Sequence, residues 1–239
     1  MAPVLSLKSI SFSYDGSEPI LGDVNFILNE REKVGLVGPN GCGKTTFLQI
    51  CVGLLKPTKG MLFYNGMPIS SEKELLELRR NVGFVFQNPD DQLFSPTVLE
   101  DVAFGPLNLN MDRDRAEKVA KKALELVGLR GFEEKITHKL SGGEKRLVSL
   151  ATILAMRPRA MLLDEPSTGL DPETRQRIIS VLNNIDISLL IVSHDWDFVV
   201  KTASKYYTIE NGRIISVEAA ALHQHLHYHP AGNVPHEHL

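Results

Sequence analysis

One glycine-rich segment of this 239-residue chain has the composition and spacing of a phosphate-binding loop. Gly38–Thr45 reads Gly-Pro-Asn-Gly-Cys-Gly-Lys-Thr and fits the pattern G-x-x-x-x-G-K-[ST]. Glycines let the backbone amides surround phosphate oxygens, and the N-terminus of a following helix adds the positive end of its dipole. In such a loop, Lys44 reaches the β- and γ-phosphates and the Thr45 hydroxyl ligates Mg²⁺. The alternative is a glycine turn with a surface lysine, which the strand-loop-helix context disfavours.

Two adjacent acids follow an apolar strand much later in the chain. Ala160–Leu163 is apolar and is followed by Asp164 and Glu165. A carboxylate at a strand tip beside a phosphate loop can hold Mg²⁺, directly or through water. Its neighbour can orient or deprotonate an attacking water. Paired acids after a strand are commonly a solvated turn, but the phosphate-binding loop favours the chemical interpretation here.

A third segment, Leu140–Glu144, places two glycines after a serine at the start of an expected helix. Ser141 is a natural helix cap, and the glycines allow an anion to approach the helix N-terminus closely. Alone, this segment indicates only a loop and a cap without a ligand. It does not stand alone, because Asp164 follows it in the chain and Gln87 and His194 each follow an expected strand.

The elements that must position these residues alternate between strand and helix in the first third. Apolar residues from Leu5 to Tyr14 recur with a period near two, and Asp15-Gly16-Ser17 supplies a turn. The sequence therefore predicts that strands lead into the phosphate-binding loop and that a helix leaves it. The elements expected after the turn are strands at Ile20–Leu28 and Lys33–Val37, a helix at Thr45–Val52, an edge strand at Met61–Tyr64 ended by Asn65-Gly66, a helix at Glu72–Arg80 and a strand at Val82–Phe86.

The middle of the chain is mostly helical, and strand character returns after it. Asp112 predicts the start of a helix that runs through Val127 and ends at Gly128. The sequence therefore predicts an α/β core interrupted by a helical insertion. The later elements expected are a helix at Glu144–Ala155, strands at Ala160–Leu163 and Leu189–Val192, and a hairpin at Tyr206–Ser216 that turns at Asn211-Gly212.

Composition excludes several classes of protein. With 43% hydrophobic and 23% charged residues, the chain has an ordinary globular composition and enough apolar residues for a core. No apolar run approaches the roughly 18 residues that a membrane span needs, and no signal peptide is recognisable. The net charge of −3 gives no global attraction to nucleic acid, and two cysteines are too few for a disulfide framework. We therefore expect a soluble cytosolic protein with a membrane role only through partners.

In this order, the motifs resemble those of an ABC-type ATPase nucleotide-binding domain over about residues 4–217. The resemblance implies an α/β fold, in which a P-loop NTPase (RecA-like) core carries an N-terminal antiparallel β-subdomain and an inserted α-helical ABC signature subdomain. It implies that residues 1–217 form the ATPase domain, with the core at 1–87 and 158–217 and the helical subdomain at 88–157, before a histidine-rich tail at 218–239. Glu144 stands where the family usually has glutamine, and Cys42 where it usually has serine.

The resemblance also implies a head-to-tail dimer that sandwiches two ATP molecules. Glu165, His194 and Gln87 then have catalytic roles. Thr45, Gln87 and Asp164 bind Mg²⁺, and Asp171 lies in a loop that crosses the dimer interface. Adenine stacking is expected of Tyr14, although an aromatic on an alternating strand is often plain core. The residues expected to bind ATP are Tyr14, Gly38, Pro39, Asn40, Gly41, Cys42, Gly43, Lys44, Thr45 and Thr46, with Ser141, Gly142, Gly143 and Glu144 acting in trans.

The segment Gln87–Val98, followed by Glu100–Pro106, resembles the ATPases of energy-coupling-factor importers, which drive cobalt, nickel and vitamin uptake. Its acidic and amide side chains precede the apolar pair Leu93 and Phe94, a mixture that suits a basic amphipathic partner. The alternative is an ordinary loop with a buried Phe94. The resemblance implies three partners, which are a second ATPase subunit (identical or not), a transmembrane coupling subunit and a substrate-capture membrane subunit. It implies peripheral attachment to the cytoplasmic face of the cell membrane.

The last stretch, Glu218–Leu239, has six of the eight histidines and no lysine or arginine. Neutral imidazole binds Ni²⁺, Co²⁺, Cu²⁺ and Zn²⁺, so a transition-metal site on this tail is predicted. Such a site favours a cobalt or nickel cargo, although tail and cargo need not be linked. A tail without function, a cloning remnant and a vitamin cargo stay as alternatives. A non-transport ABC ATPase that acts on nucleic acid is disfavoured by the net charge. The tail histidines are His223, His225, His227, His229, His236 and His238.

Overall fold

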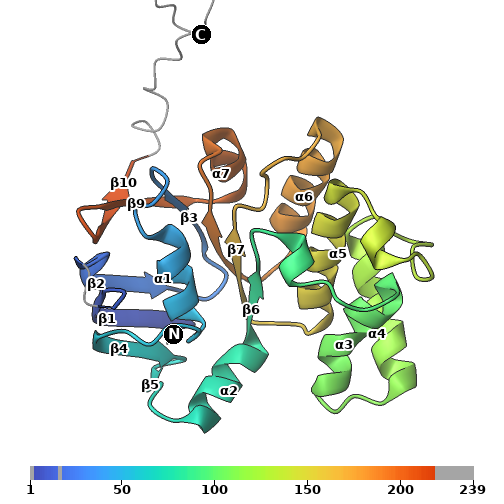
Figure 1. Ribbon diagram of the computed structural model, residues 1–239, viewed down its shortest axis with the longest axis horizontal. Helices are drawn as coiled ribbons and strands as arrows, with labels where there is room; N and C mark the ends of the chain where they lie inside the picture. Colours follow the sequence, from blue (N-terminus) through green and yellow to red (C-terminus); the bar gives the residue numbers. More distant parts are fainter. Residues whose placement is uncertain (1–2, 16–17, 219–239) are drawn as a thin grey trace, which may run out of the picture.

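Two sheets and a group of helices make up the computed structural model, which describes residues 3–15 and 18–218. The first sheet is antiparallel, has four strands and follows the order β2-β1-β4-β5 (Figure 1). Gly60 has a positive φ and lies beside the register shift between β1 and β4, where a Cβ would meet the Lys8 carbonyl oxygen at 2.4 Å. The strands are β1 (Leu5–Phe12), β2 (Leu21–Leu28), β4 (Lys59–Tyr64) and β5 (Met67–Pro68).

The second sheet has six strands in the order β10-β9-β3-β8-β7-β6, and all neighbours are parallel except β9 and β10. Its interior strands β7 and β8 are buried along their whole length, as expected for a sheet that helices cover on both faces. The strands are β3 (Lys33–Val37), β6 (Val82–Val85), β7 (Ala160–Asp164), β8 (Ser188–Val192), β9 (Lys205–Glu210) and β10 (Arg213–Val217).

One continuous core joins the two sheets around the first helix, α1 (Lys44–Cys51). Phe47 of α1 is fully buried with Leu5 of the first sheet and Val34 of the second. The other helices that flank the sheets are α2 (Glu72–Asn81), α6 (Pro172–Asn184) and α7 (Trp196–Thr202).

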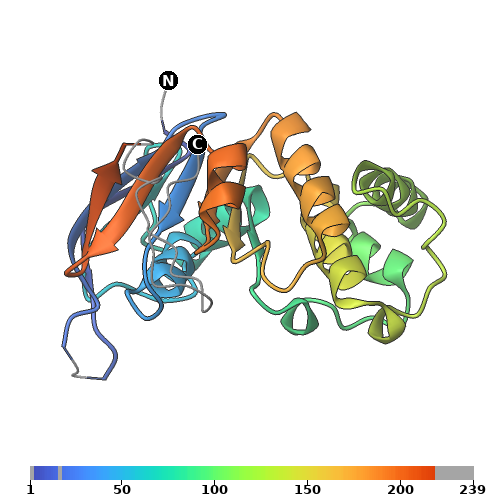
Figure 2. The same ribbon diagram turned by 90° about the horizontal axis from the view of Figure 1, so that it is seen from above.

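The inserted helices form a separate lobe, which lies at the opposite end of the molecule from the antiparallel sheet (Figure 2). It consists of α3 (Val98–Asn108), α4 (Arg113–Leu126) and α5 (Gly142–Ala155), with single 3₁₀ turns at Pro89–Asp91 and Thr137–Lys139. The lobe shares a second core with β7, β8 and α6. Its helices are therefore packed against β7, the strand that ends at the predicted acid Asp164.

Most expected elements are present, with three corrections. The strand ending at Tyr64 is not an edge strand, because β4 pairs with both β1 and β5. The helix after Ser141 begins at Gly142 rather than Glu144. Helices α6 and α7 and the short strand β5 had no predicted counterpart, and α3 was predicted only as part of a mostly helical segment. Within the described ranges, every helix is too short or too polar to span a bilayer. The predicted metal-binding histidines of the tail, from His223 to His238, lie outside the described residues.

Candidate nucleotide site

The phosphate-binding loop predicted at Gly38–Thr45 connects β3 to α1 and leaves the start of α1 open to an anion. Each of the other α-helices in the described ranges begins with a Ser, Thr or Asp side chain that accepts a bond from its first turn, whereas α1 begins at Gly43 with no such cap. The first amides of a helix have no partner inside it. Gly43 has φ 102°, and a Cβ there would lie 2.7 Å from Ile20, so this position requires glycine.

The Lys44 side chain is folded across this loop. Its Nζ donates to the carbonyl oxygens of Gly38 at 2.7 Å and Pro39 at 2.9 Å, and the residue is 6% exposed. Within the described ranges it has no carboxylate in ion-pair distance. A lysine that contacts only carbonyl oxygens is placed to make a charge-assisted bond to a phosphate group.

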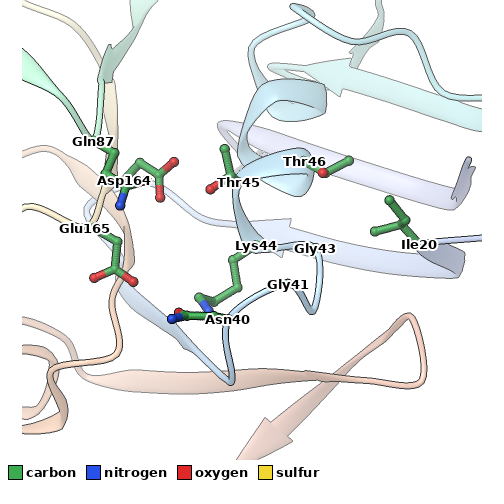
Figure 3. Close-up of a pocket in the computed structure, with 10 residues that line it drawn as sticks. All are labelled: Ile20, Asn40, Gly41, Gly43, Lys44, Thr45, Thr46, Gln87, Asp164 and Glu165. Carbon is green, nitrogen blue, oxygen red and sulfur yellow. The ribbon is translucent and has the colours of Figure 1, made fainter. Parts of the chain in front are cut away.

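Asp164 faces this loop from the end of β7, opposite Thr45 and beside Gln87 (Figure 3). It is 2% exposed, and its Oδ1 has no hydrogen-bond partner among the described residues. Burial raises the pKa of the Asp164 carboxyl above its usual value; the neighbouring Glu165 charge adds to this, while Thr45 and Lys44 oppose it. An unpartnered buried carboxylate beside a hydroxyl and an amide fits a divalent cation such as Mg²⁺, which binds few protein groups and completes its shell with phosphates and water.

Glu165 and His194 meet because β7 and β8 are parallel neighbours that end together, with Asp164 opposite Val192. Glu165 adopts a left-handed backbone at φ 47° and is 6% exposed. Its Oε2 accepts from His194 Nδ1 at 2.8 Å and from the hydroxyls of Ser193 at 3.2 Å and Thr168 at 3.3 Å. Three side chains thus hold one oxygen of this carboxylate and fix its orientation, and a general base must also be held in position.

Lys44, Thr45, Gln87, Asp164 and Glu165 line one pocket of about 320 Å³, whereas His194 is not among its lining residues (Figure 3). Tyr14 is not among the lining residues, but its hydroxyl lies 3.2 Å from Thr46 Oγ1 and the residue is 43% exposed, so its ring is accessible beside the loop. Ile20 lines the pocket, and nothing in the sequence marked it as a site residue. The lining residues are Ile20, Asn40, Gly41, Gly43, Lys44, Thr45, Thr46, Gln87, Asp164 and Glu165.

The residues predicted to act in trans form a second cluster that does not line this pocket. Ser141 caps α5 by accepting from the Glu144 amide at 3.2 Å, and the Glu144 carboxylate accepts from the Ser141 amide at 2.7 Å. These bonds lower the pKa of Glu144, first through the Ser141 amide. A Cβ on Gly143 would lie 3.4 Å from Asp171, so Asp171, which caps α6, belongs to the same cluster. Gly142 opens α5 and has free space where a Cβ would stand.

Two arginines that the motifs did not indicate support the pocket. Arg175 of α6 pairs with Asp195, next to His194, through Nε–Oδ2 at 2.9 Å and Nη2–Oδ1 at 3.0 Å. Arg146 of α5 donates to the backbone at Gln87. Both contacts join residues 20 or more positions apart, and no local sequence pattern announces them.

A groove of about 550 Å³ lies on the helical lobe, lined by Asp90, Leu93, Phe94, Ser95, Pro96, Thr97, Ile136, Thr137 and His138. Phe94 is 67% exposed and packs edge-on against Phe104 with ring centroids 4.8 Å apart. The alternative of a buried Phe94 is therefore wrong. Leu93 is only 8% exposed and packs into the core of the lobe, so it offers a partner far less surface than the sequence suggested.

Comparison with known proteins identifies the family. The family model described as ABC transporter matches residues 21–168. A protein of Nitratidesulfovibrio vulgaris, provisionally named an ABC transporter ATP-binding protein, is 48% identical over 99% of this chain and 86% of its own length. The energy-coupling factor transporter ATP-binding protein EcfA of Methanocaldococcus jannaschii is 45% identical over 89% of this chain and 77% of its own length.

Solved structures agree with these relatives. The structure of cbiO1 from Clostridium perfringens, part of the ABC transporter complex cbiONQ, has a TM-score of 0.82 and 34% identity, covering 90% of this chain and 88% of that one. A dimeric ATP-binding cassette bound to ADP and Pi in a post-hydrolysis state has a TM-score of 0.82 and 27% identity over 90% and 98%. The predicted fold class and the predicted resemblance are confirmed. The chain belongs to the ATP-binding subunits of ABC transporters, which are ATPases coupled to transport.

Proposed function

We propose that this chain is the ATP-hydrolysing subunit of an energy-coupling-factor importer that carries Co²⁺ or Ni²⁺. The observation that supports hydrolysis most directly is the placement of Asp164 and Glu165 across one pocket from Lys44 and Thr45. A nucleotide-binding module without catalysis would need the loop but not an oriented carboxylate beside it. The relatives named EcfA support the transporter class.

The residues in and beside the pocket have different roles in ATP binding and hydrolysis. The open amides of α1, the loop Gly38–Gly43 and Lys44 bind the phosphates, and Tyr14 contacts the adenine. Thr45, Asp164 and Gln87 hold Mg²⁺, which when bound neutralises phosphate charge.

Glu165 accepts the proton of the attacking water, and His194 holds that carboxylate in place through its bond at 2.8 Å. Asp171 contacts a second ATPase subunit, and Ser141–Glu144 of that subunit complete the pocket in trans. In this division, residues 1–87 and 158–217 are the core, 88–157 the helical subdomain and 218–239 the tail.

The groove beside Phe94 receives a helix of a transmembrane coupling subunit. An exposed aromatic pair beside acidic Asp90 suits a basic amphipathic helix. The assembly also includes a substrate-capture membrane subunit, and it holds this chain at the cytoplasmic face of the membrane. The membership of cbiO1 in a multi-subunit transporter complex supports such an assembly.

The cargo is inferred from composition. The six histidines between Glu218 and Leu239 are ligands for Co²⁺ and Ni²⁺. The described residues themselves contain no group of three or more His, Cys, Asp or Glu that would hold a metal ion. The cargo proposal rests on the composition of the tail, and a metal site on the tail and a metal cargo need not be linked.

The test is ATP-dependent uptake of Co²⁺ and Ni²⁺ by the native membrane complex in liposomes, with Glu165→Gln as the inactive control. Uptake that disappears in the control supports both the motor role and the cargo class. An active ATPase complex that moves neither ion would refute the metal cargo and leave a vitamin cargo to be tested. A complex without ATPase activity would refute the motor role.

A further inference from the structure

The loop that leaves β6 and contains Gln87 is fastened along one face of α5. Gln92 of this loop bonds to α5, because its Nε2 donates to the Ser149 carbonyl at 2.8 Å and to Thr152 Oγ1 at 2.7 Å. Its Oε1 accepts from the Phe86 amide at 3.2 Å. At the surface, Lys145 of α5 pairs with Asp90 at 2.6 Å. The loop is thus attached to α5 at several points.

The innermost attachment is Arg146, which is 5% exposed. Its Nη1 donates to the Phe86 carbonyl at 2.7 Å and its Nη2 to the Gln87 carbonyl at 2.5 Å. Its Nε has no hydrogen-bond partner among the described residues. Two bonds from one planar fork fix both the position and the direction of the backbone that carries the Gln87 side chain.

A buried guanidinium without a contacting carboxylate is costly to the fold, so other interactions must offset that cost. Burial lowers the pKa of Arg146, and the charges of Asp164 and Glu165 oppose that shift. The cation therefore lies within electrostatic range of both acids of the pocket while it bonds to the Gln87 backbone. It also lies about 7.5 Å along α5 from Ser141, as five residues of helix require.

We propose that Arg146 is a positioning residue, which holds Gln87 at the pocket edge and links that edge to the helix that presents Ser141. The inference rests on the proposed function, since it assigns Gln87 a place beside bound Mg²⁺. Without the guanidinium fork, the loop keeps its Gln92 and Lys145 attachments but loses the two that lie next to Gln87. The phosphate contacts of α1 and Lys44 are untouched by this change.

The test compares Arg146→Met and Arg146→Lys in a Glu165→Gln background, where nucleotide binding is measured at equilibrium without turnover. Fluorescent ATP is titrated in EDTA and then in rising Mg²⁺. We expect unchanged affinity in EDTA and a half-saturating Mg²⁺ concentration raised about tenfold by Arg146→Met, the usual effect of losing a partner behind a metal ligand. Arg146→Lys keeps the charge but loses the planar guanidinium, so we expect its half-saturating Mg²⁺ concentration to lie between those of the Glu165→Gln parent and Arg146→Met.

Arg79→Met is the matched control. Arg79 also donates to two backbone carbonyls, those of Val52 and Gly53, but at the far end of α1. Its removal is expected to leave the Mg²⁺ requirement unchanged. Thermal unfolding of each variant separates misfolding from misplacement, and Arg146→Lys carries the comparison if Arg146→Met does not fold.

A double-mutant cycle with Gln87→Ala decides whether Arg146 acts through Gln87. If it does, Arg146→Met adds nothing to the Mg²⁺ requirement of Gln87→Ala. The proposal would be overturned if the effects of Arg146→Met and Gln87→Ala on the Mg²⁺ requirement were additive. It would also be overturned if Arg146→Met had the same Mg²⁺ requirement as the control Arg79→Met. A Glu165→Gln parent whose ATP binding does not depend on Mg²⁺ at all would instead refute the proposed function of the pocket.

Discussion

Replacing Glu165 with Gln removes the base from the pocket while keeping its shape. The Gln oxygen can still accept from His194, Ser193 and Thr168, the three side chains that now bond to Oε2. Bonds to a charged acceptor are worth about 1.5–3 kcal/mol and bonds to a neutral one about 1 kcal/mol, so the fold loses at most a few kcal/mol. The lost proton acceptor lowers turnover by about 10²–10⁴-fold.

The assay has two readouts. Steady-state phosphate release measures turnover, and size-exclusion chromatography with and without ATP measures an ATP-bound dimer. We expect almost no turnover, unchanged ATP affinity and an accumulated dimer, because the pocket still binds ATP but does not hydrolyse it. Glu165→Gln with turnover within twofold of the wild type would refute the assignment of the base, whatever the dimer does.

Three other changes test separate parts of the structure. Lys44→Ala is expected to weaken ATP binding by about 10–100-fold, the effect of one lost charge-assisted bond of roughly 1.5–3 kcal/mol, measured by calorimetry. Phe94→Asp is expected to reduce co-purification of the membrane subunits, whereas Leu126→Asp, at another exposed apolar residue of the lobe, is expected to leave it intact. The pKa of Asp195 is lowered: burial opposes the shift, but the bonds from Arg175 and from the Phe198 amide outweigh it. Its ionised form stabilises the fold above its unfolded pKa, and that contribution is lost as the pH falls through the lowered folded value, so the stability difference between wild type and Asp195→Asn must shrink on acidification in urea titrations. A difference that grows toward low pH would contradict the pairing.

Local signals predicted the elements and the chemistry where the responsible contacts are also local. Asp112 caps α4 as its spacing indicated, and Asn211-Gly212 turns the β9–β10 hairpin with positive φ at both residues. Lys44, Asp164 and Glu165 line one pocket, as the order of strand, loop and helix implied.

Contacts between segments that are far apart in the sequence could not be predicted from those local signals. Leu93 and Phe94 are adjacent and similar in character, yet one is buried and the other exposed, because the packing of α3 and α5 decides which side chain is covered. Arg146 follows the glycine motif and resembles any charged residue on a helix, and only the fold brings it to Gln87. Ile20 lines the pocket because β2 begins beside α1, and the periodicity of apolar residues cannot predict that contact.

The segment from Glu165 to Asp171 links the pocket to the cluster around Ser141 within one chain. At one end, Thr168 donates to Glu165, and at the other, Asp171 caps α6 and lies against Gly143. Arg175, one turn after Asp171, pairs with Asp195 beside His194, so the same helix also supports the group that orients Glu165. A displacement of Glu165 must therefore be absorbed by this short segment or passed to Gly143. Because Ser141–Glu144 are proposed to serve the partner's pocket, the two pockets of a dimer would be coupled through the seven residues from Glu165 to Asp171 in each subunit.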